Sequence, residues 1–273
     1  MIGFNNGNYV PISQITIPAD SLAVNRGYGA YEFFGVHNGK PFYLDRHLQR
    51  FANSLKALRL YSNFFDGLEE IVIELIRLNP IPDFYLKLFV LPLNASNPEK
   101  MEGGIYIFPV VFPPFSALEF ETGMPLISRE YQRFLPEAKS TAYLAGQYWQ
   151  QEIDLAKALD VLFHSHGLIF ETSRGNVFMV KNGRIITPKN GILKGITRSV
   201  VIDLVRQKGL DFVEQEIKFT EILEADEVFV TSTTKEVMPI IRIDNVQIGN
   251  GKPGPTTKWI IEEFIRHKKK YCN

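Results

Sequence analysis

Two-residue turns that end in glycine recur along the chain, and they constrain its fold more than any other feature. They stand at Asn6-Gly7, Asn38-Gly39, His166-Gly167 and Asn182-Gly183. A type I′ hairpin turn needs positive φ at both central residues, which asparagine and glycine adopt most readily. Apolar and aromatic runs flank these turns, so we expect antiparallel strands in both halves of the chain.

Amphipathic helices are predicted between the strands. A run of apolar residues with a period near 3.6 follows Asp45, which we expect to cap that helix, and a second run covers residues 66–79. Another helix is predicted to open at residues 195–197 and to end before Gly209, and residues 256–270 form a closing helix. A helix containing Tyr143, Leu144, Trp149 and Ile153 is expected after Lys139. The predicted strands lie at 84–91, 104–112, 161–165, 168–170, 177–181 and 184–187.

Composition excludes several classes of protein. The chain has 273 residues, 45% of them hydrophobic, which is enough to bury a full core. Thirty basic and 30 acidic residues give zero formal charge, so no basic field attracts nucleic acid or an anionic membrane. The single cysteine, Cys272, excludes a disulfide framework and a cysteine metal site. With no apolar stretch long enough to span a bilayer, we expect a soluble, cytoplasmic protein without a metal.

Five short motifs stand in a fixed order. The N-terminal half carries Tyr31-Glu32 and His47-Leu48-Gln49-Arg50, and the C-terminal half carries Ala138-Lys139-Ser140, Ile169-Phe170-Glu171-Thr172 and Gly195-Ile196-Thr197-Arg198. The ordered set resembles the class IV aminotransferases. These are pyridoxal-phosphate (PLP) enzymes that include D-amino-acid aminotransferase, branched-chain aminotransferase and aminodeoxychorismate lyase. The resemblance extends over most of the chain.

The resemblance implies a fold and an assembly. The expected fold is α/β with mixed α+β character, namely the two-domain fold of D-amino-acid aminotransferase, with PLP in the cleft between the domains. Family members of this kind are homodimers, which we carry over as an expectation. The proline-rich stretch 112–116 is typical of an interdomain connection. We therefore expect a smaller domain at 1–115, a linker at 116–121 and a larger PLP-binding domain at 122–273.

The resemblance also implies the contacts of the cofactor. Lys139 would form the Schiff base with PLP and then move the α-proton, which requires an amine whose pKa is lowered by desolvation. Glu171 would bond the pyridine nitrogen and keep it protonated, so that the ring accepts the carbanion electrons. Arg50 would bind the phosphate, because a guanidinium fork suits a dianion. Further phosphate contacts are implied at Ile196, Thr197, Ser232 and Thr233.

Two of these assignments have a simpler structural alternative. Tyr143 matches a tyrosine near the cofactor phenolate in branched-chain aminotransferases, but a place in the core is equally compatible with its position. The tripeptide at residues 195–197 would expose free N–H groups to a phosphate, and a simple helix cap has the same sequence pattern. The resemblance favours phosphate binding there.

Substrate contacts are less well defined by the sequence. Tyr31 matches the tyrosine that faces the substrate in D-amino-acid aminotransferases, and the backbone amide of Thr234 matches a carboxylate contact of branched-chain enzymes. Residues 87–97 contain no arginine or histidine, although D-amino-acid aminotransferases use an Arg-x-His segment there. Arg174 is therefore either a replacement ligand for the substrate carboxylate or a surface residue. The branched-chain hallmark is also incomplete, at residues 33–37.

The expected function is transfer of an amino group between an amino acid, branched-chain or D, and a 2-oxo acid. Aminodeoxychorismate lyase, which releases pyruvate and 4-aminobenzoate, is the alternative with the same site. A non-catalytic family member is a third possibility, since the carboxylate-binding arginine is missing. The presence of Lys139, Glu171 and the phosphate-binding set argues against it.

Overall fold

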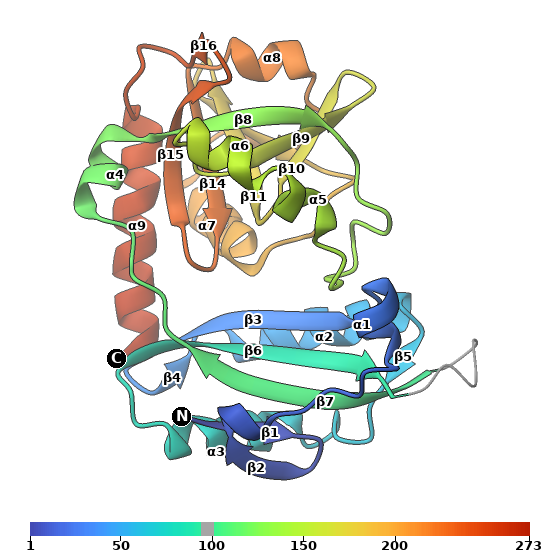
Figure 1. Cartoon of the computed structure of the whole chain (residues 1–273). Helices are drawn as coiled ribbons and strands as arrows, with labels where there is room; N and C mark the ends of the chain where they lie inside the picture. The colour runs from blue at the N-terminus through green and yellow to red at the C-terminus, as the bar shows by residue number, and fades with distance from the viewer. Residues whose placement is uncertain (94–100) are drawn as a thin grey trace. The chain divides into compact units, whose positions relative to one another are not determined.

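The computed structural model describes residues 1–93 and 101–273 (Figure 1). The chain forms two compact units, and each is built from separate stretches of sequence. The first unit consists of Met1–Pro113, Ala138–Tyr143 and Lys270–Asn273, and the second of Pro114–Glu137 and Leu144–Lys269. The expected mixed α/β class is confirmed. The expected boundaries at residues 115, 116–121 and 122 stay a prediction. The arginine-free segment 87–97 lies partly outside the described residues.

A seven-stranded sheet forms the first unit, in the order β2-β1-β7-β6-β3-β4, with β5 paired to β7. Along β6, Phe84, Leu86, Leu88 and Val90 are buried, so one face of the sheet belongs to the core. Helix α2 contacts β3, and α3 contacts β1. The elements of this unit are β1 (Ile2–Asn5), β2 (Asn8–Pro11), a 3-10 turn (Ile12–Gln14), α1 (Leu22–Arg26), β3 (Ala30–His37), β4 (Lys40–Pro41), α2 (Leu44–Ala57), β5 (Leu60–Tyr61), α3 (Leu68–Leu78), β6 (Asp83–Pro92) and β7 (Met101–Val110).

The start of α2 differs from the expectation. The helix begins at Leu44, its cap position is Tyr43, and no side chain accepts a hydrogen bond there. The prediction that Asp45 caps the helix is therefore wrong. Asp45 lies inside the first turn, where a carboxylate still interacts favourably with the positive end of the helix dipole. The buried face of the helix includes His47 and Ser54 beside its apolar residues.

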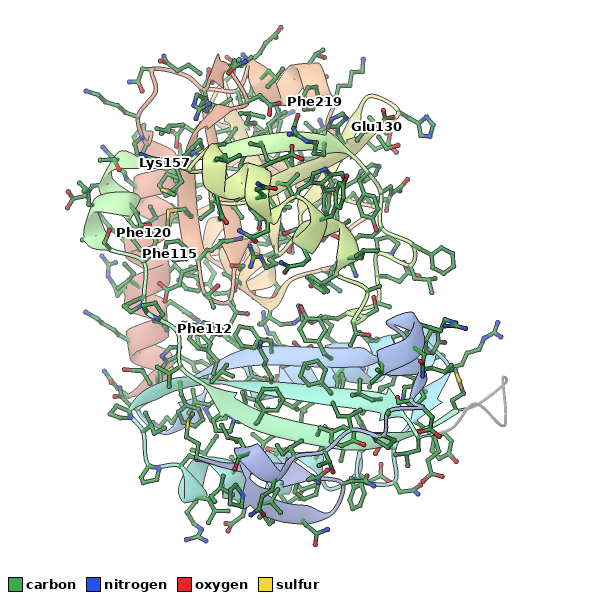
Figure 2. The ribbon with its side chains drawn as sticks, viewed as in Figure 1. Phe112, Phe115, Phe120, Glu130, Lys157 and Phe219 are labelled. Atoms are coloured by element: carbon green, nitrogen blue, oxygen red, sulfur yellow. The ribbon has the colours of Figure 1, made fainter. Side chains whose placement is uncertain are left out.

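A nine-stranded sheet forms the second unit, in the order β10-β9-β8-β15-β14-β11-β12-β13, with β16 paired to β15. Because β10 also pairs with β11, part of this sheet closes on itself. Phe115, Phe120 and Phe219, labelled in Figure 2, pack against its buried apolar cluster. The strands are β8 (Met124–Glu130), β9 (Val161–Ser165), β10 (Leu168–Thr172), β11 (Gly175–Lys181), β12 (Arg184–Pro188), β13 (Phe212–Gln215), β14 (Glu227–Ser232), β15 (Glu236–Ile243) and β16 (Val246–Gln247).

Short helices connect these strands. The single helix expected from Tyr143 to Ile153 is replaced by two short ones, and Tyr143 precedes both. The helices are α4 (Ala117–Thr122), α5 (Leu144–Tyr148), α6 (Gln150–Leu155), α7 (Ile196–Lys208), α8 (Phe219–Leu223) and α9 (Pro255–Cys272), the last of which ends in the first unit. None of the helices in the described ranges has the length and apolar character needed to span a membrane.

The four predicted hairpin turns are present. Asn6, Asn38, His166 and Asn182 have φ between 46° and 50°, and the glycine after each also has positive φ. These turns connect β1 to β2, β3 to β4, β9 to β10 and β11 to β12. The β9–β10 and β11–β12 hairpins bring Glu171 and Asn176 to adjacent strand ends, where they are register partners.

Candidate active site

The backbone of Lys139 is fixed by the edge of the first sheet. Tyr31 N donates to Lys139 O at 3.0 Å, and Thr141 N donates to Gly29 O at 2.9 Å. On its other side, Lys139 N donates to the Ser54 hydroxyl of α2 at 3.0 Å. The segment Ala138–Tyr143 therefore extends the sheet beside β3, and this pairing places the lysine next to Tyr31.

The side chain of Lys139 contacts the phenol of Tyr31. Lys139 Nζ donates to the Tyr31 hydroxyl at 3.1 Å and lies 4.3 Å from the centre of its ring. Tyr143 contacts the same ring edge-on, with 5.4 Å between ring centres. Burial, and after it the charge and hydrogen bond of Tyr143, hold the pKa of Tyr31 well above its usual value. Tyr31 is therefore a neutral phenol near neutral pH, and Lys139, Tyr31 and Tyr143 form one cluster.

Arg50 is oriented by a buried carboxylate. Its Nε and NH2 atoms donate to the two oxygens of Glu32 at 2.9 and 2.5 Å. His47 Nδ1 lies 3.1 Å from the same carboxylate, and Phe33 N donates to it at 2.7 Å. Burial acts to raise the pKa of Glu32, but Arg50 and His47 outweigh it and hold that pKa far below its usual value. Glu32 is thus an ionised group that fixes the guanidinium.

Glu171 is buried in the second unit, although a glutamate at a strand end is usually exposed. Arg133 NH1 donates to Oε1 at 3.0 Å, and the backbone N–H of Leu193 donates to Oε2 at 3.0 Å. Two donors of this kind favour the ionised carboxylate. Leu193 precedes α7, so the same bond connects Glu171 to the start of that helix.

Asn176 holds the turn that leads into α7. Its Nδ2 donates to Leu193 O at 2.7 Å, and its Oδ1 accepts from Gly195 N at 3.1 Å. A Cβ added at Gly195 would lie 2.4 Å from Asn176 Oδ1, so the close approach requires glycine. Ile196 and Thr197 are the first two residues of α7, and both side chains are buried.

The predicted phosphate turn follows β14. The Ser232 hydroxyl accepts from Lys235 N at 3.2 Å and retains its own hydrogen for donation. Ser232, Thr233 and Thr234 are half-buried. Thr231 before them is 1% exposed, and within the described ranges its hydroxyl has no hydrogen-bond partner. Thr231 is the register partner of Asn176, so both side chains belong to the same sheet face.

Arg174 is exposed. Its NH2 donates to the Gln150 side chain at 3.3 Å, and this contact turns the guanidinium toward α6. The structure thus groups Lys139, Tyr31, Tyr143 and Arg50 in the first unit. In the second unit it groups Glu171 with the start of α7 and the end of β14. Arg174 contacts Gln150 at the surface, and its role toward a substrate stays a prediction.

The donor set fits PLP. A pyridine nitrogen needs a carboxylate, a phosphate needs N–H and hydroxyl donors, and an aldehyde needs a lysine amine. Glu171 meets the first need. The start of α7 and the unpartnered Thr231 hydroxyl meet the second, and Lys139 meets the third. No group of three or more histidine, cysteine or acidic side chains in the described part of the chain is arranged to hold a metal ion.

The residues that orient the site are not apparent from the sequence. Arg133 lies in a loop between exposed residues, where an arginine is usually solvated. Thr231 reads as an ordinary strand residue. Glu32 has a signal, because it follows Tyr31 in the matched aromatic-Glu pair, but its partner Arg50 is 18 residues away.

Comparison with known proteins identifies the family. Residues 29–243 match the family described as amino-transferase class IV. D-alanine aminotransferase of Bacillus licheniformis is 32% identical over 263 residues, which cover 93% of this chain and 92% of that protein. A putative branched-chain-amino-acid aminotransferase of Methanocaldococcus jannaschii is 28% identical, with 95% and 93% covered.

Solved structures agree with this match. A branched-chain amino acid aminotransferase solved with pyridoxamine 5'-phosphate, from the source abbreviated T.th., has a TM-score of 0.90 and 26% identity, covering 97% of this chain and 93% of that one. The branched-chain enzyme of Escherichia coli has a TM-score of 0.89 and 25% identity, with the same coverage. The family match spans most of the chain and includes the lysine, the glutamate and the start of α7. The chain therefore belongs to the class IV aminotransferases.

Proposed function

We propose that this class IV aminotransferase transfers the amino group of a branched-chain or D-amino acid to a 2-oxo acid, with PLP bound through Lys139. The observation that carries the proposal is the contact of Lys139 Nζ with the buried, neutral phenol of Tyr31 at 3.1 Å. A lysine amine held by a neutral hydroxyl group, with its backbone fixed on both sides, suits a nucleophile and proton carrier.

The residues that would hold PLP follow from the two clusters. Glu171, fixed by Arg133 and by the backbone of Leu193, would receive the pyridine nitrogen. Tyr143 would lie beside the ring through its contact with Tyr31. The phosphate would be held by Arg50, Ile196, Thr197, Ser232 and Thr233.

The protein residues divide the chemistry between them. When bound, PLP supplies an electron sink for the electrons left on Cα when the α-proton is removed. Lys139 Nζ takes that proton and delivers it to the neighbouring carbon. The ionised Glu171 keeps the pyridine nitrogen protonated, and Tyr31 remains a hydrogen-bond donor because its pKa is raised. The substrate carboxylate would be bound by the backbone amide of Thr234 and by Tyr31, with Arg174 as a further candidate.

The names of the relatives favour transamination over the lyase reaction. Those reported above are aminotransferases of D-alanine or of branched-chain amino acids. The two names differ in the stereochemistry of the substrate, so both classes of donor remain part of the proposal. We also propose a homodimer, as the family resemblance implies, and a cytoplasmic location, which the single cysteine supports.

The deciding experiment is the visible spectrum of the purified protein before and after borohydride, with Lys139→Ala beside it. We expect a yellow wild type whose band borohydride removes and whose cofactor then maps to the peptide of Lys139. Lys139→Ala should lack that band and lose amino transfer. Lys56→Ala, an exposed lysine on α2, is the matched control and should behave as wild type.

The same preparation separates the alternatives. A colourless wild type that takes up no added PLP would contradict the catalytic function. Pyruvate released without an amino acceptor would identify a lyase. D-alanine and L-leucine, offered with 2-oxoglutarate, would assign the donor class.

A further inference from the structure

A buried ion pair lies outside the residues assigned above. Asp160, which precedes β9, is fully buried, and Lys235, in the turn between β14 and β15, is 5% exposed. Lys235 Nζ contacts Asp160 Oδ2 at 2.5 Å. Lysine and aspartate are almost never buried to this extent without a partner. A pair of buried charges usually adds less stability than well-packed apolar residues of similar volume. Some other property of the protein therefore needs to account for it.

Asp160 connects the pair to the strand of Glu171. Its Oδ1 accepts from Val161 N at 2.9 Å and from the Ser173 hydroxyl at 2.5 Å. Its Oδ2 accepts from the Thr172 hydroxyl at 3.1 Å as well as from Lys235. Thr172 and Ser173 directly follow Glu171. Four donors occupy the acceptor sites of the carboxylate, so its position is closely defined.

Lys235 connects the pair to the hydroxyl-rich turn. Its backbone N–H donates to the Ser232 hydroxyl, which closes the turn over Thr233 and Thr234. Its side chain is buried, whereas the two threonines are half-buried. Burial acts to raise the pKa of Asp160, but Lys235, Arg174 and the Ser173 hydroxyl outweigh it and hold that pKa below its usual value. The carboxylate is therefore ionised and remains paired with the lysine.

From this geometry we infer that Asp160 and Lys235 are positioning residues for the Ser232–Thr234 turn. They hold the turn in a fixed place relative to Glu171, so that its hydroxyl and N–H groups are preorganised for the oxyanion of a ligand. A turn that is already ordered binds an anion more tightly, because less conformational entropy is lost on binding. The inference rests on the proposed function. The oxyanion is either the cofactor phosphate or the substrate carboxylate, and these two sources can be distinguished by experiment.

The test uses Lys235→Met, Asp160→Asn and the double variant. Lys235→Met leaves a buried carboxylate without its cation, so its urea midpoint should fall. The double variant removes both charges and keeps similar volumes, so its midpoint should lie near that of wild type. Asp244→Asn is the control: Asp244 ties β8 to the end of β15 through Ser128, with bonds of 2.9 and 2.6 Å. It should change the urea midpoint alone.

For each variant, PLP is titrated into the apoprotein, and KM and kcat are measured with the best amino donor. In the double variant we expect about a tenfold increase in either the Kd of PLP or the donor KM, with a much smaller change in kcat. An increase in the PLP Kd assigns the turn to the phosphate. An increase in KM with an unchanged Kd assigns it to the substrate carboxylate. A purely structural role would change neither value in a double variant of wild-type stability.

The failures of the two proposals differ. A wild type that binds PLP, together with a double variant of unchanged Kd and KM, overturns this inference alone. A wild type that takes up no PLP overturns the proposed function and the inference with it.

Discussion

Thr231 and Thr187 are buried threonines on strands of the same sheet, but their hydroxyl groups have different surroundings. Thr187 Oγ1 donates to Val177 O at 2.8 Å. The Thr231 hydroxyl has no partner among the residues that the structure describes. A buried polar group without a hydrogen bond costs about 1–3 kcal/mol, and a satisfied one contributes about 1 kcal/mol. The same substitution should therefore have opposite effects at the two positions.

Thr231→Val should leave the free energy of unfolding of the apoprotein unchanged or raise it by about 1 kcal/mol, because a methyl group replaces an unsatisfied hydroxyl. Thr187→Val should lower it by about 1–2 kcal/mol, since its bond to Val177 is lost. Urea unfolding of the two apoproteins measures both values. If the Thr231 hydroxyl receives the cofactor, PLP affinity should decrease for Thr231→Val alone. Equal destabilisation by both substitutions would contradict the assignment of Thr231 as unpartnered.

At the scale of single residues, the sequence predicts the groups that carry chemistry better than the groups that orient them. Lys139, Glu171 and Arg50 stand in short motifs, so their identity can be read locally. Arg133 and Lys235 act through partners 38 and 75 positions away. A one-dimensional pattern holds no record of such a partner, and a charged residue beside a strand resembles a solvated one.

Helix α7 depends on the residues that hold the turn before it. Asn176 bonds to Leu193 O and to Gly195 N, so one side chain satisfies two backbone groups at the start of the helix. Without these bonds, a buried carbonyl and an N–H group would lose their partners. The position of the first N–H groups of α7, where the phosphate is proposed to bind, depends on the same two bonds.

Asn176→Ala should lower the free energy of unfolding by about 2–4 kcal/mol and weaken PLP binding. Gly195→Ala should also be destabilising, because its Cβ would lie 2.4 Å from Asn176 Oδ1. In the double variant that oxygen is absent, so the two effects should be less than additive. Exposed Asn190→Ala is the control for urea unfolding and PLP titration. Strict additivity would show that Gly195 is required for a different reason.

Elements with local signals were predictable, and their arrangement was not. The asparagine-glycine turns determine the β1–β2, β3–β4 and β11–β12 hairpins through the φ values they require. The order β2-β1-β7-β6-β3-β4 depends on pairings between distant strands, such as Phe4 with Ile107. The cap of α2 was mispredicted because Asp45 has the residue type of a cap, whereas the backbone places Tyr43 there.

Each unit holds a buried carboxylate whose pKa lies below its usual value, so the stability of the whole molecule is linked to pH. Glu32 in the first unit is paired with Arg50 and His47, and Asp160 in the second with Lys235. For both, burial raises the pKa and the paired cations outweigh it; the usual values are 4.5 for Glu and 3.8 for Asp. The folded state therefore has the lower pKa. Below the usual values the unfolded chain binds more protons, so the free energy of unfolding decreases as the pH falls.

Glu32→Gln should separate the share of one carboxylate from the rest. At pH 7 the variant should be about 3 kcal/mol less stable, because Arg50 loses its buried counterion. Its stability should depend less on pH than that of wild type between about pH 5 and pH 3, since one linked group is gone. Urea unfolding at several pH values measures this slope. The circular dichroism signal reports on the whole chain, and tryptophan fluorescence reports on the second unit, which contains both Trp149 and Trp259. Exposed Glu69→Gln on α3 is the matched control. Equal pH slopes for wild type and Glu32→Gln would mean that Glu32 has the same pKa in the folded and unfolded chains, so that its ion pair with Arg50 makes no pH-linked contribution to stability.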